Sequence, residues 1–383
     1  MLIREFIWLV PFLCIALMAI SLFRPLPHLP APAHSRIVVD AMGAPVRIAL
    51  PFQGTVLTFG AHASQYLAAT RSPETLLIAG GKGYIATRQW FAACEMRWVY
   101  PQVLNEDHFW DLKGRLRGHG PFVEIENAFA FNPGVYLGSM GGPMLVMRRI
   151  GLPALYTTVG QSKDWNQDPI TETRVMSGVA GQSEWGETLI ARFWQAYADL
   201  EQDLKPASIT HKLRVLSVWS SSSNLAFLRS RGGDYPCAGL RDASEGYYPL
   251  AKVTDAERIL ATDPDSIIQW GERPQDFMND PRWRGFKAVQ ERRVYRPPVW
   301  WSSPEGILFR PLNLRWLAEV AYPERLKPKV RQLFRDIFMR NFGYRVSDDQ
   351  IDKDIRFDQS KNQPSFERFG RDYKELNKQE LQK

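Results

Sequence analysis

The sequence contains few of the side chains from which many enzymes and metal sites are built. Its 383 residues include only three cysteines, Cys14, Cys94 and Cys237, and six histidines. The cysteines lie far apart, and their spacing is not that of a metal site. Cys94 and Cys237 either pair in an oxidising compartment or are small buried residues. A cysteine-based metal centre is therefore not expected.

Common catalytic motifs are also absent. The sequence has no GxSxG, HExxH, SxxK or CxxC pattern, each of which would place a nucleophile, a base or metal ligands at a defined spacing. Cys237 lies in GDYPCAGL without a histidine nearby in the sequence. We therefore expect the protein not to be an enzyme. A cleft enzyme, formed by residues distant in sequence, is the weaker alternative.

The chain lacks a concentrated patch of one charge. Its formal net charge is +7, but lysine and arginine are interspersed with aspartate and glutamate, so we expect no nucleic-acid partner. Apolar residues make up 45% of the chain, which is enough for a buried core. The thirteen tryptophans exceed what is usual, and this surplus suits a site for a flat or bulky ligand.

One long apolar run stands at the N-terminus. It extends from Phe6 to Phe23, follows the charged start MLIRE, and precedes the proline-rich RPLPHLPAPAHS with a small-residue exit at Ala31–Ala33. This order is typical of a secretory signal peptide. The run is also long enough to remain as a single membrane anchor. Either interpretation places the rest of the chain outside the cytoplasm.

Apolar runs then alternate with segments of helical spacing. RIVVDAMGAPVRIALP (Arg36–Pro51) has the alternation of a β-hairpin around Met42 and Gly43. Apolar runs that end in glycine and precede helical segments favour a mainly parallel sheet covered by helices. The runs are Thr55–Gly60, Thr75–Gly81, Gly134–Gly142 and Leu152–Gly160.

A long amphipathic segment separates this unit from a second one. In Ser183–Leu204, apolar residues recur at helical spacing, and Lys205-Pro206 ends the pattern. After it the alternation resumes, with strands at Leu213–Ser220 and within Ala256–Trp270, and with Asp263–Tyr295 predicted as strand, crossover helix and strand. The fold class that we predict is α/β, with two Rossmann-like lobes joined by one long helix.

The predicted division of the chain follows from these patterns. The last segment is rich in charged and amide residues, so we expect it to be disordered or loosely helical. The segments are 1–33, a signal peptide or membrane anchor; 34–182, an N-terminal α/β lobe; 183–205, a bridging helix; 206–346, a C-terminal α/β lobe; and 347–383, a polar C-terminal tail.

The order of these segments resembles the periplasmic binding proteins that deliver iron–siderophore, haem and cobalamin complexes to ABC importers. The resemblance covers about Arg36 to Arg345. It rests on RIVVDAMGAPVRIALP, NPGVYLGS, IGLPALYTT, the helix at Ser183–Leu204, RVLSVWS, TDPDSII, WRGFKAVQERRVY and LRWLAEVAYPE. It implies two rigid lobes with a ligand cleft between them, a metal-chelate ligand (ferric siderophore, haem or corrinoid), no intrinsic cofactor and an ABC permease as partner.

The chain departs from this family's pattern in one respect. Family members usually present a surface glutamate on each lobe, near the first turn after a strand, which docks to the transporter. The corresponding segments here, GSMGGPMLVMRR and SSSSNLAFLRSR, contain no carboxylate. A membrane-tethered sensor or accessory protein of the same fold is therefore the alternative function.

Candidate ligand-binding residues follow from the strand ends, because ligands bind beyond the carboxyl ends of parallel strands. They combine aromatic, hydroxyl and basic side chains that suit the apolar face and the polar rim of a chelate. The set is His62, Lys82, Tyr84, Arg117, His119, Met140, Trp219, Ser221, Arg241, Tyr247, Trp270, Trp300 and Trp301.

His119 is the candidate metal ligand. It lies between two glycines in RGHGPFVEIE, and the resemblance implies that this loop corresponds to the one that presents the axial ligand in haem-carrying members. Neutral imidazole is a common metal ligand. A solvated loop histidine and an exposed loop arginine are the alternatives for His119 and Arg117, and a local backbone contact at a helix start is the alternative for His62.

Overall fold

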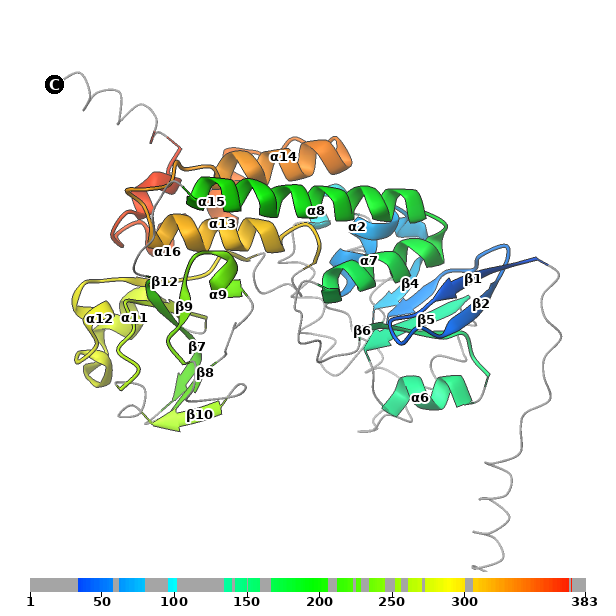
Figure 1. Ribbon diagram of the computed structural model, residues 1–383, viewed down its shortest axis with the longest axis horizontal. Helices are drawn as coiled ribbons and strands as arrows, with labels where there is room; N and C mark the ends of the chain where they lie inside the picture. Colours follow the sequence, from blue (N-terminus) through cyan, green and yellow to red (C-terminus); the bar gives the residue numbers. More distant parts are fainter. Residues whose placement is uncertain are drawn as a thin grey trace, which may run out of the picture.

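Two α/β lobes lie beneath one long helix (Figure 1). The computed structural model describes residues 34–57, 62–79, 96–101, 134–139, 142–149, 151–158, 167–205, 212–222, 225–228, 234–244, 252–255, 261–270, 273–299, 306–371 and 373. The predicted fold class is confirmed. The residue limits assigned to the two lobes remain a prediction.

The first described element is a β-hairpin. Strands β1 (Ser35–Val39) and β2 (Pro45–Ala49) pair antiparallel, with Val39 opposite Pro45. In the turn, the Asp40 carboxylate accepts hydrogen bonds from the backbone N–H groups of Met42 and Ala44, both at 2.9 Å, and Gly43 adopts φ +77°. The hairpin predicted around Met42 and Gly43 is therefore confirmed.

The N-terminal sheet is wholly parallel. Its four strands have the order β4–β3–β5–β6. The strands are β3 (Thr55–Leu57), β4 (Leu76–Ala79), β5 (Val135–Ser139) and β6 (Ala154–Thr158), and the helices of this lobe are α2 (Ala63–Thr70), α4 (Met96–Val99), α6 (Gly142–Arg149) and α7 (Gln167–Ala180). Each apolar run predicted as a strand in this lobe contains one of these strands.

The C-terminal sheet is mixed. Strands β11 (Ser266–Gln269) and β12 (Val294–Tyr295) run parallel to β7 (Arg214–Ser222). On the other side, β8 (Leu225–Leu228) pairs antiparallel with β7, and β10 (Lys252–Asp255) pairs antiparallel with β8. The short strand β9 (Arg241–Asp242) pairs with the start of β7, and α9 (Asp234–Cys237) precedes it.

Between β11 and β12 the chain forms two short helices rather than the one predicted. They are α11 (Pro274–Asn279) and α12 (Lys287–Gln290), separated by a 3-10 turn at Pro281–Trp283. Trp283 is buried, stacks on Phe277 with ring centroids 5.0 Å apart, and also contacts Phe286. This aromatic group fills the second core, so a strand–crossover–strand unit is present, as expected, with a broken crossover.

Helix α8 (Ser183–Leu204) is the long helix, and its bounds match the predicted amphipathic segment. Its 22 residues span about 33 Å at about 1.5 Å per residue. Leu189, Phe193 and Leu200 on its inner face are buried. In Figure 1, α8 lies above α7 and α2 at one end and beside α13 (Arg310–Ala321) at the other, so it connects both lobes.

The N-terminal end of α8 is held by close packing. Gly186 lies so near α7 that a Cβ atom there would stand 2.2 Å from the Ser177 Oγ. Next to it, the Trp185 indole N–H donates to the Ala68 carbonyl of α2 at 2.9 Å. A side chain larger than hydrogen at position 186 would force the two helices apart.

Buried charges hold the C-terminal end of α8. Arg315 of α13 pairs with Asp203 of α8 and with the fully buried Glu319, whose Oε1 accepts from the Arg315 Nε at 2.5 Å. Glu319 also accepts from the backbone N–H of Lys329 at 2.7 Å. Burial raises the pKa of Glu319, and the Arg315 guanidinium acts against that rise. The ion pair therefore keeps a charged group inside the core.

The last part of the chain is folded, which corrects the sequence prediction. Helix α14 (Val330–Phe342) is followed by α15 (Asp348–Asp354), which starts with a capping box between Ser347 and Gln350, and by α16 (Phe357–Ser360). The expectation of a disordered or loosely helical tail is wrong for residues 347–371, because a few apolar side chains anchor it. Those fully or almost fully buried are Ile351, Ile355, Phe366 and Phe369.

Replacing Arg315 with methionine is expected to lower the free energy of unfolding by about 3–5 kcal/mol, because Glu319 would remain buried without its main partner. Urea unfolding at neutral pH measures the change. The matched control is Arg174→Met: Arg174 pairs with Glu187 at 2.7 Å on an exposed surface, where such a pair contributes at most about 1 kcal/mol. Equal losses for the two variants would contradict the role given to the buried cluster.

Replacing Phe366 with alanine is expected to lower the free energy of unfolding by about 3–5 kcal/mol, because its fully buried ring packs on Phe369 with centroids 4.9 Å apart. Met339→Ala is the control, since Met339 is 44% exposed on α14 and is expected to change stability by about 0.5 kcal/mol or less. An unaffected melting curve for the Phe366 variant would show that the tail does not contribute to the core.

Candidate ligand site at the strand ends

The carboxyl ends of the parallel strands define where a ligand is expected in this fold. In the N-terminal sheet these ends are at Leu57, Ala79, Ser139 and Thr158, and in the C-terminal sheet the central strands end at Ser222 and Gln269. Most of the segments that follow these ends lie outside the described residues. The described part of the candidate site therefore consists of the strand ends and of the first turns of helices behind them.

Eight of the predicted site residues lie outside the described residues and stay predictions. They are Lys82, Tyr84, Arg117, His119, Met140, Tyr247, Trp300 and Trp301. Trp219 and Ser221 belong to the carboxyl half of β7, beside a register shift between Val218 and Ser220. This places both at the expected edge of the C-terminal sheet.

Trp270 lies at the same edge. It follows β11 directly, and its backbone N–H donates to the Val218 carbonyl of β7 at 2.8 Å. Its indole N–H donates to the Ser217 hydroxyl at 2.7 Å, and only 8% of the residue is exposed. Because its polar atom already has a partner, the ring contributes an apolar surface held in one orientation.

Arg241 lies at the opposite end of the strands of the C-terminal sheet. It belongs to β9 and pairs with Arg214, the first residue of β7. Since β7 and β9 are parallel, this is the amino end of the strand. The structure therefore does not bring exposed Arg241 together with Trp219, Ser221 and Trp270.

His62 lies inside the N-terminal lobe. It occupies the residue before α2, is 6% exposed, and burial lowers its pKa to about 4. Its imidazole is therefore neutral at neutral pH, which is the form that binds metals. The whole of α2 behind it is buried, so His62 marks the inner end of the candidate site rather than its exposed rim.

Glu172 of α7 is a buried acid that sequence analysis did not identify. It is 8% exposed, and its pKa is raised to about 8, first by burial and further by Asp168, while the Gln65 side chain of α2 acts in the opposite direction. The carboxyl group is therefore mostly protonated at neutral pH and can donate a hydrogen bond. The signal in the sequence was weak, because α7 carries the glutamate in a segment without clear apolar periodicity.

Gln65 also marks a contact between the lobes. Its side chain lies against Gly306, which precedes α13, with a Cγ distance of 3.5 Å from the position of a Cβ atom on that glycine. A void of about 10 Å³ remains there, lined by α2 and by residues 306–309; this is about the space of a single water molecule. The buried polar groups of α2 and α7 thus lie next to the junction between the lobes.

Two further observations concern the described residues only. Within them, no three or more histidine, cysteine, aspartate or glutamate side chains gather in a way that could hold a metal ion. Across the same ranges, no helix combines the length and apolar content needed to cross a bilayer. His119 and the apolar run Phe6–Phe23 are outside these ranges.

Comparison with known proteins agrees with this architecture. Residues 155–298 match the model of the family described as periplasmic binding protein. The match includes the end of the N-terminal sheet, α8 and the core strands of the second lobe, so the resemblance predicted from the sequence is confirmed. No curated protein matches the chain.

Solved structures extend the similarity to most of the chain. A periplasmic solute binding protein from Veillonella parvula is 18% identical, with a TM-score of 0.70, and the match covers 86% of this chain and 99% of that one. The Haemophilus influenzae molybdate binding protein MolA, bound to molybdate, is 15% identical, with a TM-score of 0.65 and coverages of 82% and 99%.

The Helicobacter pylori protein CeuE with Ni(II) bound is 14% identical, with a TM-score of 0.63 and coverages of 82% and 97%. At these identities the likeness establishes the fold. The family and the similar structures are solute-binding proteins rather than enzymes.

In the wild-type protein, the free energy of unfolding is expected to fall as pH rises from 4.5 toward 8. Replacing Glu172 with glutamine is expected to remove this fall. The folded-state pKa is raised from 4.5 to about 8, so the protonated form favours folding fully below pH 4.5, and this contribution is lost as pH rises toward 8. Relative to wild type, the variant should gain about 1.4 kcal/mol per pH unit across this window in urea unfolding.

His62→Gln is the matched comparison and has the opposite sign. Its folded-state pKa is lowered from 6.5 to about 4, so wild-type stability falls as pH falls through this window, and the variant should gain relative to wild type on acidification. If both variants followed the wild-type pH profile, the two groups would not be buried in the folded protein.

Proposed function

We propose that this protein is an exported binding protein that captures a metal chelate between its two lobes for delivery to an ABC importer. The observation that carries the proposal is the arrangement of the lobes. Two lobes, each built on a sheet with parallel strands, are joined through one 22-residue helix that packs on α2 and α7 of the first lobe and on α13 of the second. A preformed site of this kind lowers the cost of ordering on binding. The chelate classes are ferric siderophore, haem and corrinoid.

The chemistry at the described edges supports an apolar or flat ligand. Trp270 presents a ring whose indole N–H is already bonded to Ser217, and Trp219 lies on the neighbouring strand. At the other lobe, buried His62 and protonated Glu172 provide polar atoms without a net charge at neutral pH. His119 is the residue that we propose as axial metal ligand if the chelate has an open coordination position.

Similar structures widen the range of metal-containing solutes that the binding experiment must include. Two of them hold Ni(II) and molybdate as the bound species. Export is supported by the apolar run Phe6–Phe23, as a cleaved signal or as an anchor. The family also places its members outside the cytoplasm.

A second candidate function is a membrane-tethered accessory or sensor protein that binds a ligand without import. The specific observation that favours it concerns the transporter-docking segments. Helix α6 has no acidic residue in its first turn. In the C-terminal lobe, the segment after β7 forms the antiparallel strand β8 instead of the helix turn that would carry a docking glutamate. Docking to a permease would therefore use other contacts.

Native mass spectrometry of the purified protein tests the ligand class. The protein is incubated in turn with haem, cobalamin, ferric siderophores, nickel–histidine and molybdate, and we expect a one-to-one complex with one metal chelate. If haem binds, His119→Ala is expected to abolish its absorbance shift, whereas His108→Ala, the same change elsewhere in the sequence, is expected to retain it. Absence of every complex would contradict chelate capture, and co-purification with a permease would favour import over the accessory role.

A further inference from the structure

A groove lies on the side of α8 that faces away from both sheets. Figure 1 shows α14 alongside α8, with the two sheets on the other side of α8. Between these helices and the start of α13 is a cavity of about 470 Å³. This volume falls within the range of small-molecule sites, about 300–1,000 Å³. The groove is separate from the strand ends that form the candidate chelate site.

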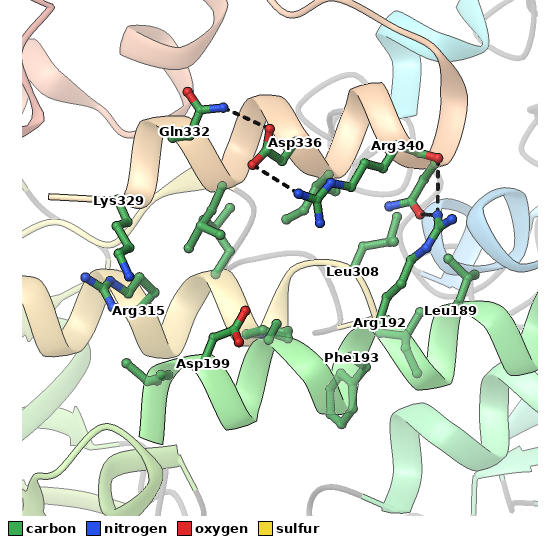
Figure 2. A pocket seen from close by; sticks show the side chains of 18 of the residues that line it. Leu189, Arg192, Phe193, Asp199, Leu308, Arg315, Lys329, Gln332, Asp336 and Arg340 are labelled. Carbon is green, nitrogen blue, oxygen red and sulfur yellow. Dashed lines mark hydrogen bonds and ion pairs between the residues drawn. The ribbon is translucent and has the colours of Figure 1, made fainter. Parts of the chain in front are cut away.

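The walls of the groove are largely aliphatic. The two helices α8 and α14 direct side chains toward each other across it, and the segment leading into α13 closes its base (Figure 2). Water in such a channel can be displaced favourably by an apolar chain. The aliphatic residues that line it include Leu189, Leu200, Leu308, Leu312, Leu333 and Ile337.

The charges at the two ends of the groove differ. At one end, Arg315 and Lys329 share the Asp203 carboxylate. At the other end, Arg192 donates to the Arg340 carbonyl at 3.2 Å and to the Asn341 amide oxygen. Among the described residues, no carboxylate pairs with Arg192. At this second end, no carboxylate of the described residues therefore neutralises the positive charge of Arg192.

Arg71 adds to this positive end. Its guanidinium lies 3.6 Å from the centroid of the Trp185 ring, and that of Arg192 lies 5.4 Å from the same ring. Both arginines also donate to Asn341, at the end of α14. Burial, then Arg71 and Arg340, lower the pKa of Arg192. The carbonyl end of a helix offsets only about half a charge, so an anion would relieve this crowding.

Two carboxylates lie along the middle of the groove. Asp199 of α8 accepts a hydrogen bond from Gln195 at 2.8 Å, and Asp336 of α14 accepts from Gln332 at 2.9 Å and lies 3.8 Å from Arg340. Figure 2 shows both between the two ends. They would repel an anionic group in the middle of the groove and so favour its placement at Arg192.

We propose that this groove binds a single-chain, long-chain carboxylate, with its aliphatic chain between α8 and α14 and its carboxylate on Arg192. The planar guanidinium fork matches a carboxylate with two parallel hydrogen bonds. A cavity of about 470 Å³ is in the lower half of the range for small-molecule sites, which suits one chain rather than the two of a phospholipid.

Photoaffinity labelling of the full-length protein tests the proposal. The probe is palmitate that carries a diazirine on its chain, and crosslinked peptides are mapped by mass spectrometry. We expect labels on α8 and α14. Unlabelled palmitate should compete about tenfold more effectively than hexadecanol, which has the same chain without the charge. Labels elsewhere, equal competition by hexadecanol, or stronger competition by a phospholipid would each overturn it.

Two variants separate the chain contact from the charge contact. Ile337→Trp fills the groove and is expected to abolish labelling. Leu145→Trp, at an exposed position of α6, is the matched control and should label as wild type does. Arg192→Gln, at an exposed position on α8, is expected to reduce palmitate affinity about tenfold without changing that of hexadecanol.

Thermal melting shows whether the Ile337 variant folds. If it does not, the Arg192 variant carries the test, and unchanged palmitate affinity in that variant would refute the proposed head-group contact. Chelate binding provides an independent readout, since neither variant touches the strand ends. If the wild-type protein bound no chelate, this result would contradict the proposed function and would leave the groove proposal unaffected.

Discussion

The structure depends on how helix α8 is held at both of its ends. At its start, Gly186 allows α7 to approach so closely that a methyl group would collide with Ser177. At its end, Arg315 and Glu319 form a buried ion pair that also engages Asp203 of α8. A rigid rod fixed in this way on both lobes keeps the carboxyl edges of two separate sheets in a constant relation. The ligand site that we propose between them would therefore not have to be assembled when the ligand arrives.

Burial has different consequences for ionisable groups in different parts of the protein. Arg315 and Glu319 lie almost wholly inside the core and remain a pair, because each removes much of the other's desolvation cost. Glu172 and His62 are also buried, but their pKa values shift to about 8 and about 4, so that both groups are mainly uncharged at neutral pH. Charged groups therefore strengthen the connection between helices, while uncharged polar groups line the inner end of the candidate ligand site.

The two sides of α8 have different chemical characters. The strand ends below it present a fixed tryptophan ring and neutral polar groups, which suit a flat or chelated ligand. The groove beside α14 combines an aliphatic base with Arg192, which lies over the same Trp185 ring as Arg71. The C-terminal lobe adds a further difference, because strand β8 extends its sheet where the family resemblance implies a docking turn. A single architecture thus offers surfaces for more than one kind of molecule.

Periodicity in the sequence was sufficient for the α/β class, the hairpin around Met42 and Gly43, and the bounds of α8, because short-range alternation of apolar residues determines these elements. It was insufficient for residues 347–371, because the few apolar residues there form no periodic pattern within a mostly polar segment. Phe366 and Phe369 are nevertheless almost completely buried in the folded protein. The same holds for the position of Arg241 at the amino end of β7 and for the burial of Glu172. The sequence by itself determined which segments form strands and helices, and the tertiary structure alone decided which polar groups meet, because strand pairing and helix packing join residues far apart in the chain.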